Sequence, residues 1–257
     1  MNKIKAIFFD IDGTLVSFRT HSIPSSTSVA LNKLRQKGIK LFIASGRQFG
    51  LINNLGQEHF DGYVTINGAL TLVDNKIINH TPIPRTDIDA VNQILCSDKK
   101  FPCIFVTEKE ILSNYTNNDV EEIKQLINFP NIPVGNIKDN TDDVYQLIAF
   151  FRKEQEEEIM CKLPNCTTAR WHPLFADVIA SGVSKVTGIE SVCKHFGIKQ
   201  EEVMAFGDGG NDIEMLQWAG VGVAMGNAND EVKQIADFVT TSVDEDGILN
   251  AVQHFFN

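Results

Sequence analysis

The chain opens with a short apolar run that ends in two acidic residues. Residues Ile4–Phe9 are mostly β-branched or aromatic, and Asp10, Ile11, Asp12 and Gly13 follow directly. Such a run predicts a buried strand. Two carboxylates so close together repel and each needs a partner, for which a divalent cation bound by hard oxygen ligands, such as magnesium, is suited. Asp-Gly is also a common turn dipeptide, so the run alone leaves an ordinary polar turn open.

The segments that follow alternate between strands and helices. After the acidic turn we expect helices over 24–37 and 48–55 and strands over 39–44 and 63–66. The alternation resumes after residue 182, with helices expected over 185–196 and 247–255 and strands over 203–206, 221–224 and 238–240. A strand-helix-strand order of this kind predicts a parallel sheet, and ligands of open parallel sheets lie at the carboxyl ends of the strands.

The middle of the chain has a different pattern. Pro82 and Pro84 mark a linker. Beyond them, strands expected over 104–107, 144–151, 167–171 and 176–180 are mixed with helices. We therefore predict two domains: a core made of residues 1–82 and 184–257, and an inserted α+β module over 83–183.

The net charge, the cysteines and the lengths of the apolar runs limit which partners the chain can have. The 257 residues carry a formal net charge of -10, which argues against nucleic acid as a general partner but leaves a small phosphate ester open. The five cysteines form no C-x-x-C pair, which favours reduced thiols in a cytoplasmic protein. No run approaches the ~20 apolar residues of a membrane helix, so we expect no membrane partner.

Two turns at predicted strand ends carry candidate catalytic groups. Asp10 is the candidate nucleophile and Asp12 the candidate acid and base, with Thr14 holding their turn. Ser45 and Gly46 offer a hydroxyl and backbone N–H groups to phosphate oxygens, although a serine there is as often a helix N-cap. The adjacent Arg47 either reaches substrate or forms an ion pair with an acid.

Two later segments complete the candidate site. Lys185 begins a predicted helix where it can neutralise charge on the nucleophile and the phosphoryl group, although in isolation it is better explained as a surface lysine. In the loop Gly207–Asp212, Asp208 is placed to share a metal with Asp10, Asn211 to donate to phosphate, and Asp212 to hold Lys185 or water. The chain contains neither a dinucleotide-binding fingerprint nor a P-loop.

Together these segments resemble a known family. FFDIDGTL at 8–15, ASGR at 44–47, Lys185 and GDGGND at 207–212 are similar to the four motifs of the haloacid dehalogenase superfamily. NGA at 67–69 and GVAMGNA at 222–228 resemble its Cof-type sugar-phosphate phosphatases, which carry a large α+β cap. The resemblance extends over essentially the whole length.

The resemblance implies a fold, a cofactor and a cap. The expected fold class is α/β, a Rossmann-like parallel-sheet core with an inserted α+β cap that acts as a lid and selects substrates. The expected cofactor is Mg²⁺, bound by the carboxylates of Asp10 and Asp208 and the main-chain carbonyl of Asp12. We expect Ile11 to join Ser45, Gly46, Lys185 and Asn211 in binding phosphate. Since the cap would cover the site, we expect a monomer.

The predicted function is hydrolysis of small phosphate esters, most of all hexose and other sugar phosphates, through an aspartyl-phosphate. This makes the chain a phosphoric monoester hydrolase whose partner is a small molecule. Candidate substrate contacts are Asn67 in the core and His172 and Asp177 in the inserted module. Two alternatives stay open: a sugar phosphomutase of the same superfamily and a non-catalytic protein that binds sugar phosphates.

Overall fold

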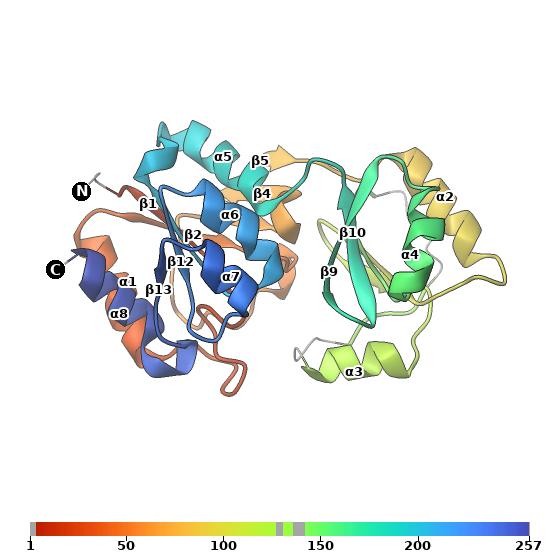
Figure 1. Cartoon of the computed structure of the whole chain (residues 1–257). Coiled ribbons are helices and arrows are strands. Elements are labelled where there is room, and N and C mark those ends of the chain that lie inside the picture. The colour runs from red at the N-terminus through yellow and green to blue at the C-terminus, as the bar shows by residue number, and fades with distance from the viewer. Residues whose placement is uncertain (1–3, 127–130, 136–141, 257) are drawn as a thin grey trace. The chain divides into compact units, whose positions relative to one another are not determined.

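The computed structural model describes residues 4–126, 131–135 and 142–256, and the chain divides into two compact units. The first unit combines the two ends of the chain, Met1–His80 and Ser184–Asn257. The second unit is the segment between them, Thr81–Val183 (Figure 1). The chain therefore leaves the first unit once and returns to it once.

An eight-stranded sheet forms the centre of the first unit. Its strands, in spatial order, are β13 (Phe238–Val239), β12 (Val221–Ala224), β11 (Val203–Gly207), β1 (Ala6–Phe9), β2 (Lys40–Ala44), β3 (Gly62–Thr65), β4 (Leu70–Val73) and β5 (Lys76–His80). The pairs from β13 to β3 are all parallel, whereas β3–β4 and β4–β5 are antiparallel. Since β1 lies between β11 and β2, the residues after these three strands meet at one edge.

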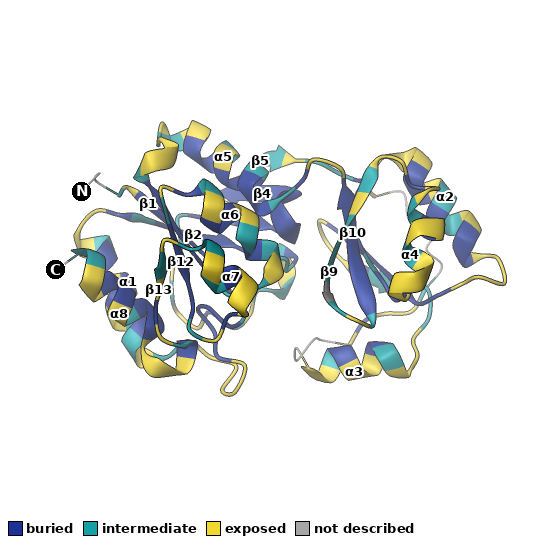
Figure 2. Cartoon of the chain, viewed as in Figure 1, coloured by how far each residue is buried: buried dark blue, intermediate teal, exposed yellow. Residues whose placement is uncertain are grey.

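Helices cover both faces of this sheet. Alternate residues of β1 point to opposite faces, and each set packs in its own apolar cluster. Ile7 and Phe9 pack with α1 (Ser25–Gln36) and α8 (Gly247–Phe256), which lie side by side in Figure 1. Ala6 and Phe8 pack with the helices on the other face: α5 (Lys185–Phe196), α6 (Ile213–Trp218) and α7 (Asp230–Ile235). Figure 2 shows the inner strands of the sheet mostly dark blue, between helices that are yellow on their outer sides.

The helix expected over 48–55 does not form, and one hairpin of this unit was not expected. Residues 48–55 form only a short 3₁₀ turn, Phe49–Leu51, because Gln48 is extended and Gly50 is a poor helix former. The antiparallel strands β4 and β5 had no predicted counterpart. Their turn places Asp74 and Asn75 at φ 50° and 58°, in the left-handed region that these two residue types tolerate.

The second unit has its own sheet and core. Its five strands, all antiparallel to their neighbours, are in order β7 (Ile111–Ser113), β6 (Cys103–Thr107), β8 (Val144–Ala149), β10 (Phe175–Ala180) and β9 (Cys166–His172). The helices are α2 (Arg85–Leu95), α3 (Asn118–Leu126) and α4 (Lys153–Met160). Ile88, Phe105, Leu147 and Ile159 belong to one apolar cluster that joins α2 and α4 to the sheet.

The predicted fold class is confirmed, since a largely parallel, helix-covered sheet accompanies a separate antiparallel α+β unit. The role predicted for the second unit, choice of substrate, stays a prediction. None of the helices in the described residues has the length and apolarity needed to cross a membrane.

Candidate active site

Three neighbouring parallel strands bring the candidate catalytic residues to one edge of the sheet. Asp10 follows β1 and its N–H donates to the carbonyl of Phe206, so the strand pairing extends to this residue. Ser45 follows β2, and Asp208 follows β11. The sequence places a polar group after each strand, and the parallel register gathers them.

A buried lysine lies between two aspartates at this edge. The Lys185 ammonium is 2.6 Å from Asp10 Oδ1 and 2.6 Å from Asp212 Oδ1. The side chains of Lys185 and Asp212 are each 1% exposed. Lys185 is therefore not a surface lysine: removing it would leave two buried carboxylates without their cation.

Two glycines allow α5 to carry Lys185 this close. A Cβ at Gly68 would lie 1.9 Å from the carbonyl oxygen of Ser184, and one at Gly188 would lie 2.4 Å from Val64 Cγ1. Gly68 also has a φ of 96°, which L side chains rarely adopt. The first turn of α5 can therefore sit directly against the segment that follows β3.

Asp10, Asp208 and Asp212 have carboxylate oxygens within 4.8 Å of one another. Both oxygens of Asp212 are already engaged, because Oδ1 is bound by Lys185 and Oδ2 accepts from the N–H groups of Asp208 (3.0 Å) and Gly209 (2.8 Å). Asp212 thus holds Lys185 and the loop in place. Asp10 and Asp208 are therefore the carboxylates suited to bind a cation. Their all-oxygen character fits a hard divalent ion.

The negative charges of Asp10, Asp208 and Asp212 exceed the positive charge of Lys185. Burial, only partly offset by the positive charge of Lys185, raises the pKa of Asp10 to about 7. Burial and the negative charges of Asp10 and Asp212 raise the pKa of Asp208 to about 8. Burial alone lowers the pKa of Lys185, but Asp10 and Asp212 outweigh it and raise that pKa above its usual value. A divalent cation would favour the ionised forms of Asp10 and Asp208.

Asp12 points to a different partner. Arg47 binds its carboxylate with two groups, Nε to Oδ2 at 2.6 Å and Nη2 to Oδ1 at 2.8 Å. A third guanidinium nitrogen, Nη1, donates to the carbonyl of Leu51. Of the two roles left open for Arg47, the structure therefore contains the ion pair, and its partner is the candidate acid and base.

The expected phosphate-binding groups are in place as donors. In the described part of the chain, the backbone N–H groups of Ile11 and Gly46 have no hydrogen-bond partner. The Ser45 hydroxyl accepts from the N–H of Arg47 at 3.2 Å, which leaves its own hydrogen to donate. Asn211 donates from Nδ2 to Asn67 Oδ1 at 3.2 Å. Asn67, a predicted substrate contact, is 4% exposed and orients Asn211.

The two candidate substrate contacts of the second unit are His172, the last residue of β9, and Asp177, within β10. His172 accepts from the N–H of Leu174 at 3.4 Å and stacks on Phe175, whereas Asp177 is 6% exposed. Their contact with substrate stays a prediction.

One residue outside the predicted set also touches the site. Asn227, after β12, donates to Asp208 Oδ2 and to the carbonyl of Gly13. Its segment, 222–228, was predicted only to resemble the family, because an asparagine in a turn has no sequence pattern that indicates its partner.

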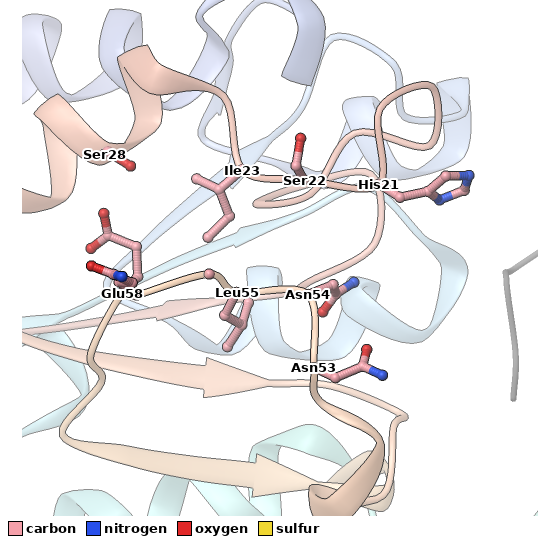
Figure 3. Close-up of a pocket in the computed structure, with 10 residues that line it drawn as sticks. His21, Ser22, Ile23, Ser28, Asn53, Asn54, Leu55 and Glu58 are labelled. Carbon is pink, nitrogen blue, oxygen red and sulfur yellow. The ribbon is translucent and has the colours of Figure 1, made fainter.

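The first unit also has a surface hollow of about 430 Å³, lined by residues of 21–28 and 53–58, among them His21, Asn54 and Glu58 (Figure 3). None of the candidate catalytic residues lines it. The Oδ1 atom of Asn54 has no hydrogen-bond partner, but this oxygen is buried and is not exposed in the hollow. The hollow is therefore not the centre of the chemistry.

Comparison with known families agrees with this geometry. The family of haloacid dehalogenase-like hydrolases matches residues 7–252. The chain belongs to this family, which confirms the resemblance stated from its motifs.

Individual relatives indicate which kind of hydrolase the chain is. The chain is 35% identical to YkrA of Bacillus subtilis (strain 168), a candidate phosphatase, over 97% of this chain and 96% of that one. It is 29% identical to the 5-amino-6-(5-phospho-D-ribitylamino)uracil phosphatase YitU of the same strain, over 98% and 97%. The solved structure of the subclass IIB sugar phosphatase BT4131 matches with 46% identity and a TM-score of 0.90 over 98% of each chain. Within its family the chain is a phosphatase, as predicted.

Proposed function

We propose that this phosphatase hydrolyses small phosphorylated metabolites, chiefly sugar phosphates, with Mg²⁺ and through a phosphoryl group carried on Asp10. The observation that carries the proposal is the buried group formed by Asp10, Lys185 and Asp212 beside Asp208. It joins a candidate nucleophile, a fixed positive charge and a second carboxylate for a cation at the carboxyl edge of the parallel sheet.

In the first half-reaction, a carboxylate oxygen of Asp10 forms a bond to phosphorus while the bond from phosphorus to the ester oxygen breaks. Asp12 gives its proton to the departing alkoxide, which leaves as an alcohol. Lys185, at 2.6 Å from Asp10, fixes the nucleophile and favours its ionised form. The products are an aspartyl-phosphate and the free alcohol.

In the second half-reaction, Asp12 takes a proton from water as the water oxygen attacks phosphorus. The acyl-phosphate bond breaks, inorganic phosphate leaves, and the Asp10 carboxylate is restored. Because Arg47 engages both oxygens of Asp12, that pair must separate before Asp12 acts on the leaving group.

The carboxylates of Asp10 and Asp208 and the carbonyl of Asp12 would hold Mg²⁺, and the bound ion would neutralise charge on the phosphoryl oxygens. Thr14 donates to Asp208 Oδ1 at 2.8 Å and so orients this ligand. Asp212 holds Lys185 in place. The N–H groups of Ile11 and Gly46, the Ser45 hydroxyl and the Asn211 amide would bind the phosphoryl oxygens.

Sugar phosphates are proposed as substrates because of the relatives' names. BT4131 is described as a sugar phosphatase, and YitU as acting on a phospho-D-ribityl compound. We further propose that the second unit selects substrates as a cap, with His172 and Asp177 as contacts, and that the enzyme is a cytoplasmic monomer. Its cysteines are all unpaired, which suits a reducing compartment.

The test is phosphate release from a panel of phosphate esters with and without Mg²⁺. Asp10→Asn keeps the size of the side chain but removes the nucleophile, so we expect kcat to fall by at least about 10⁴-fold. Asp74→Asn is the matched control, because Asp74 lies in an exposed turn at φ 50°, which asparagine adopts readily.

Label transferred from a ³²P-phosphate ester should remain on quenched wild-type protein and be absent from Asp10→Asn. Activity in Asp10→Asn, or full turnover after chelation of divalent ions, would contradict the proposal. An isomerised sugar phosphate without free phosphate would identify a phosphomutase, and tight binding without turnover would identify a sugar-phosphate sensor.

A further inference from the structure

Asn227 links three segments that are far apart in the sequence. Its Nδ2 donates to the carbonyl of Gly13 at 2.9 Å and to Asp208 Oδ2 at 3.2 Å. Its Oδ1 accepts from the N–H of Val243 at 2.9 Å. The side chain thus ties the turn after β1, the loop after β11 and the segment before α8 to one another.

Asp208 is held on both of its oxygens. The Thr14 hydroxyl donates to Oδ1 at 2.8 Å, and the Asn227 amide donates to Oδ2. A carboxylate with a donor on each oxygen has a fixed rotation about its Cβ–Cγ bond, and each oxygen keeps a lone pair for a cation. Asn227 therefore supplies half of the hydrogen bonds that orient this candidate ligand.

The same amide also fixes the distance between Asp208 and the catalytic turn. The two are so close that a Cβ at Gly13 would lie 2.2 Å from Asp208 Oδ2. The Gly13 carbonyl that Asn227 binds follows directly on Asp12, whose own carbonyl is an expected metal ligand. One amide group thus bridges the peptide next to one proposed ligand and the carboxylate of another.

We propose that Asn227 is a positioning residue that sets the divalent-cation affinity of the site by holding Asp208 at a fixed distance from the turn that carries Asp12. The inference rests on the proposed function, because it assumes that Asp208 binds Mg²⁺. Partners that orient metal ligands typically change metal affinity by 10- to 100-fold when removed.

A role in packing does not explain these contacts. Asn227 is exposed, so a smaller side chain at this position leaves no buried cavity. Of the three hydrogen bonds that its side chain makes to described residues, one reaches the Val243 N–H before α8, and the other two are directed to the site. A substitution should therefore change the site without unfolding the protein.

The experiment compares Asn227→Ala with wild type by titrating Mg²⁺ into the metal-free protein in a calorimeter. We expect the Kd for Mg²⁺ to rise about 10-fold. The Mg²⁺ concentration for half-maximal phosphate release should rise in parallel, while kcat at saturating Mg²⁺ stays within about twofold of wild type, since no reacting group is lost. Asn229→Ala is the matched control: Asn229 is exposed, two residues away, and its side chain makes no hydrogen bond within the described residues.

An unchanged Kd in Asn227→Ala would overturn the inference, as would a kcat that stays low at saturating Mg²⁺ with normal affinity. A metal-free melting temperature well below that of Asn229→Ala would indicate a structural role and also count against it. If wild type binds Mg²⁺ and turns over but Asn227→Ala binds equally well, only this inference fails. If wild type binds no divalent ion, the proposed function fails together with it.

Discussion

Buried and partly buried carboxylates occur in both units, but their neighbours shift the carboxylate pKa in opposite directions. In the first unit, burial raises the pKa of Asp10 to about 7 and, with neighbouring acids, that of Asp208 to about 8. In the second unit, burial would raise the pKa of Asp87 and Glu156, but hydrogen-bond donors outweigh it and lower both.

The difference separates a reactive site from a structural one. Asp87 accepts from the backbone and side chain of Asn165 and from Thr86, so the folded chain satisfies its charge. The group around Asp10 has Lys185 as its one buried cation among the described side chains, and it is crowded by other acids. Such a group binds a cation or a proton, and it is suited to chemistry rather than to stability.

Among the substitutions that test this comparison, Lys185→Met should have the largest effect on stability. It removes the ammonium but keeps an unbranched side chain of similar length. The variant leaves Asp10 and Asp212 buried without a partner. We expect kcat to fall by about 10³-fold and the free energy of unfolding at pH 7 to fall by about 3–5 kcal/mol. Phosphate release and urea denaturation measure the two quantities. Stability equal to wild type in metal-free buffer would refute the assigned ion pairs.

Asp87→Ala tests the structural side of the comparison. The substitution removes a carboxylate that is 2% exposed and that accepts from the backbone and the side chain of Asn165. We expect the free energy of unfolding to fall by about 2–3 kcal/mol, while Mg²⁺ affinity is unchanged. Denaturation and calorimetry check both. A change in Mg²⁺ affinity as large as that of a site variant would remove the distinction between the two units.

The sequence predicted the groups of the site better than their contacts. Asp10, Asp12, Ser45 and Asp208 could be identified because each follows a short apolar run, and parallel strands gather their carboxyl ends. The burial of Lys185 could not, because it depends on how closely α5 approaches the segment after β3, which Gly68 and Gly188 permit only in three dimensions.

The same limit applies to the fold. The parallel sheet could be predicted from the alternation of strands and helices, whereas residues 48–55 suggested a helix that Gly50 interrupts. The bidentate pair of Arg47 with Asp12 joins residues 35 apart, and Asn227 is 214 residues from Gly13. Contacts of that range leave no local pattern in a single sequence.

A smaller effect is expected on how stability depends on pH in the metal-free protein, and the carboxylates of the two units should contribute to it with opposite signs. Because folding raises the pKa of Asp10 and Asp208, their contribution to stability is present at low pH and is lost as pH rises from about 4 toward 8. Protons then compete with Mg²⁺ below pH 7, so we expect the Mg²⁺-induced rise in melting temperature to be at least about twofold larger at pH 8 than at pH 6.

Thermal melts with and without Mg²⁺ across this range provide the measurement, and Asp208→Asn is the control that removes one of the two groups. A Mg²⁺-induced shift that does not depend on pH would mean that the cation does not displace protons from this pair.

The smallest effect is expected from Glu156→Gln. Glu156 accepts from the Thr168 hydroxyl at 2.8 Å and from Arg170 Nε at 3.1 Å, and Gln keeps an oxygen for one of these donors while removing the charge. We expect a loss of about 1 kcal/mol at pH 7 with unchanged kcat. Because folding lowers the pKa of Glu156, the difference between wild type and variant should vanish as pH falls through that lowered value. Urea denaturation at pH 7 and at pH 3 measures it. A difference that grows toward low pH would mean that Glu156 behaves like Asp10, and the contrast between satisfied and crowded carboxylates would then not divide the two units.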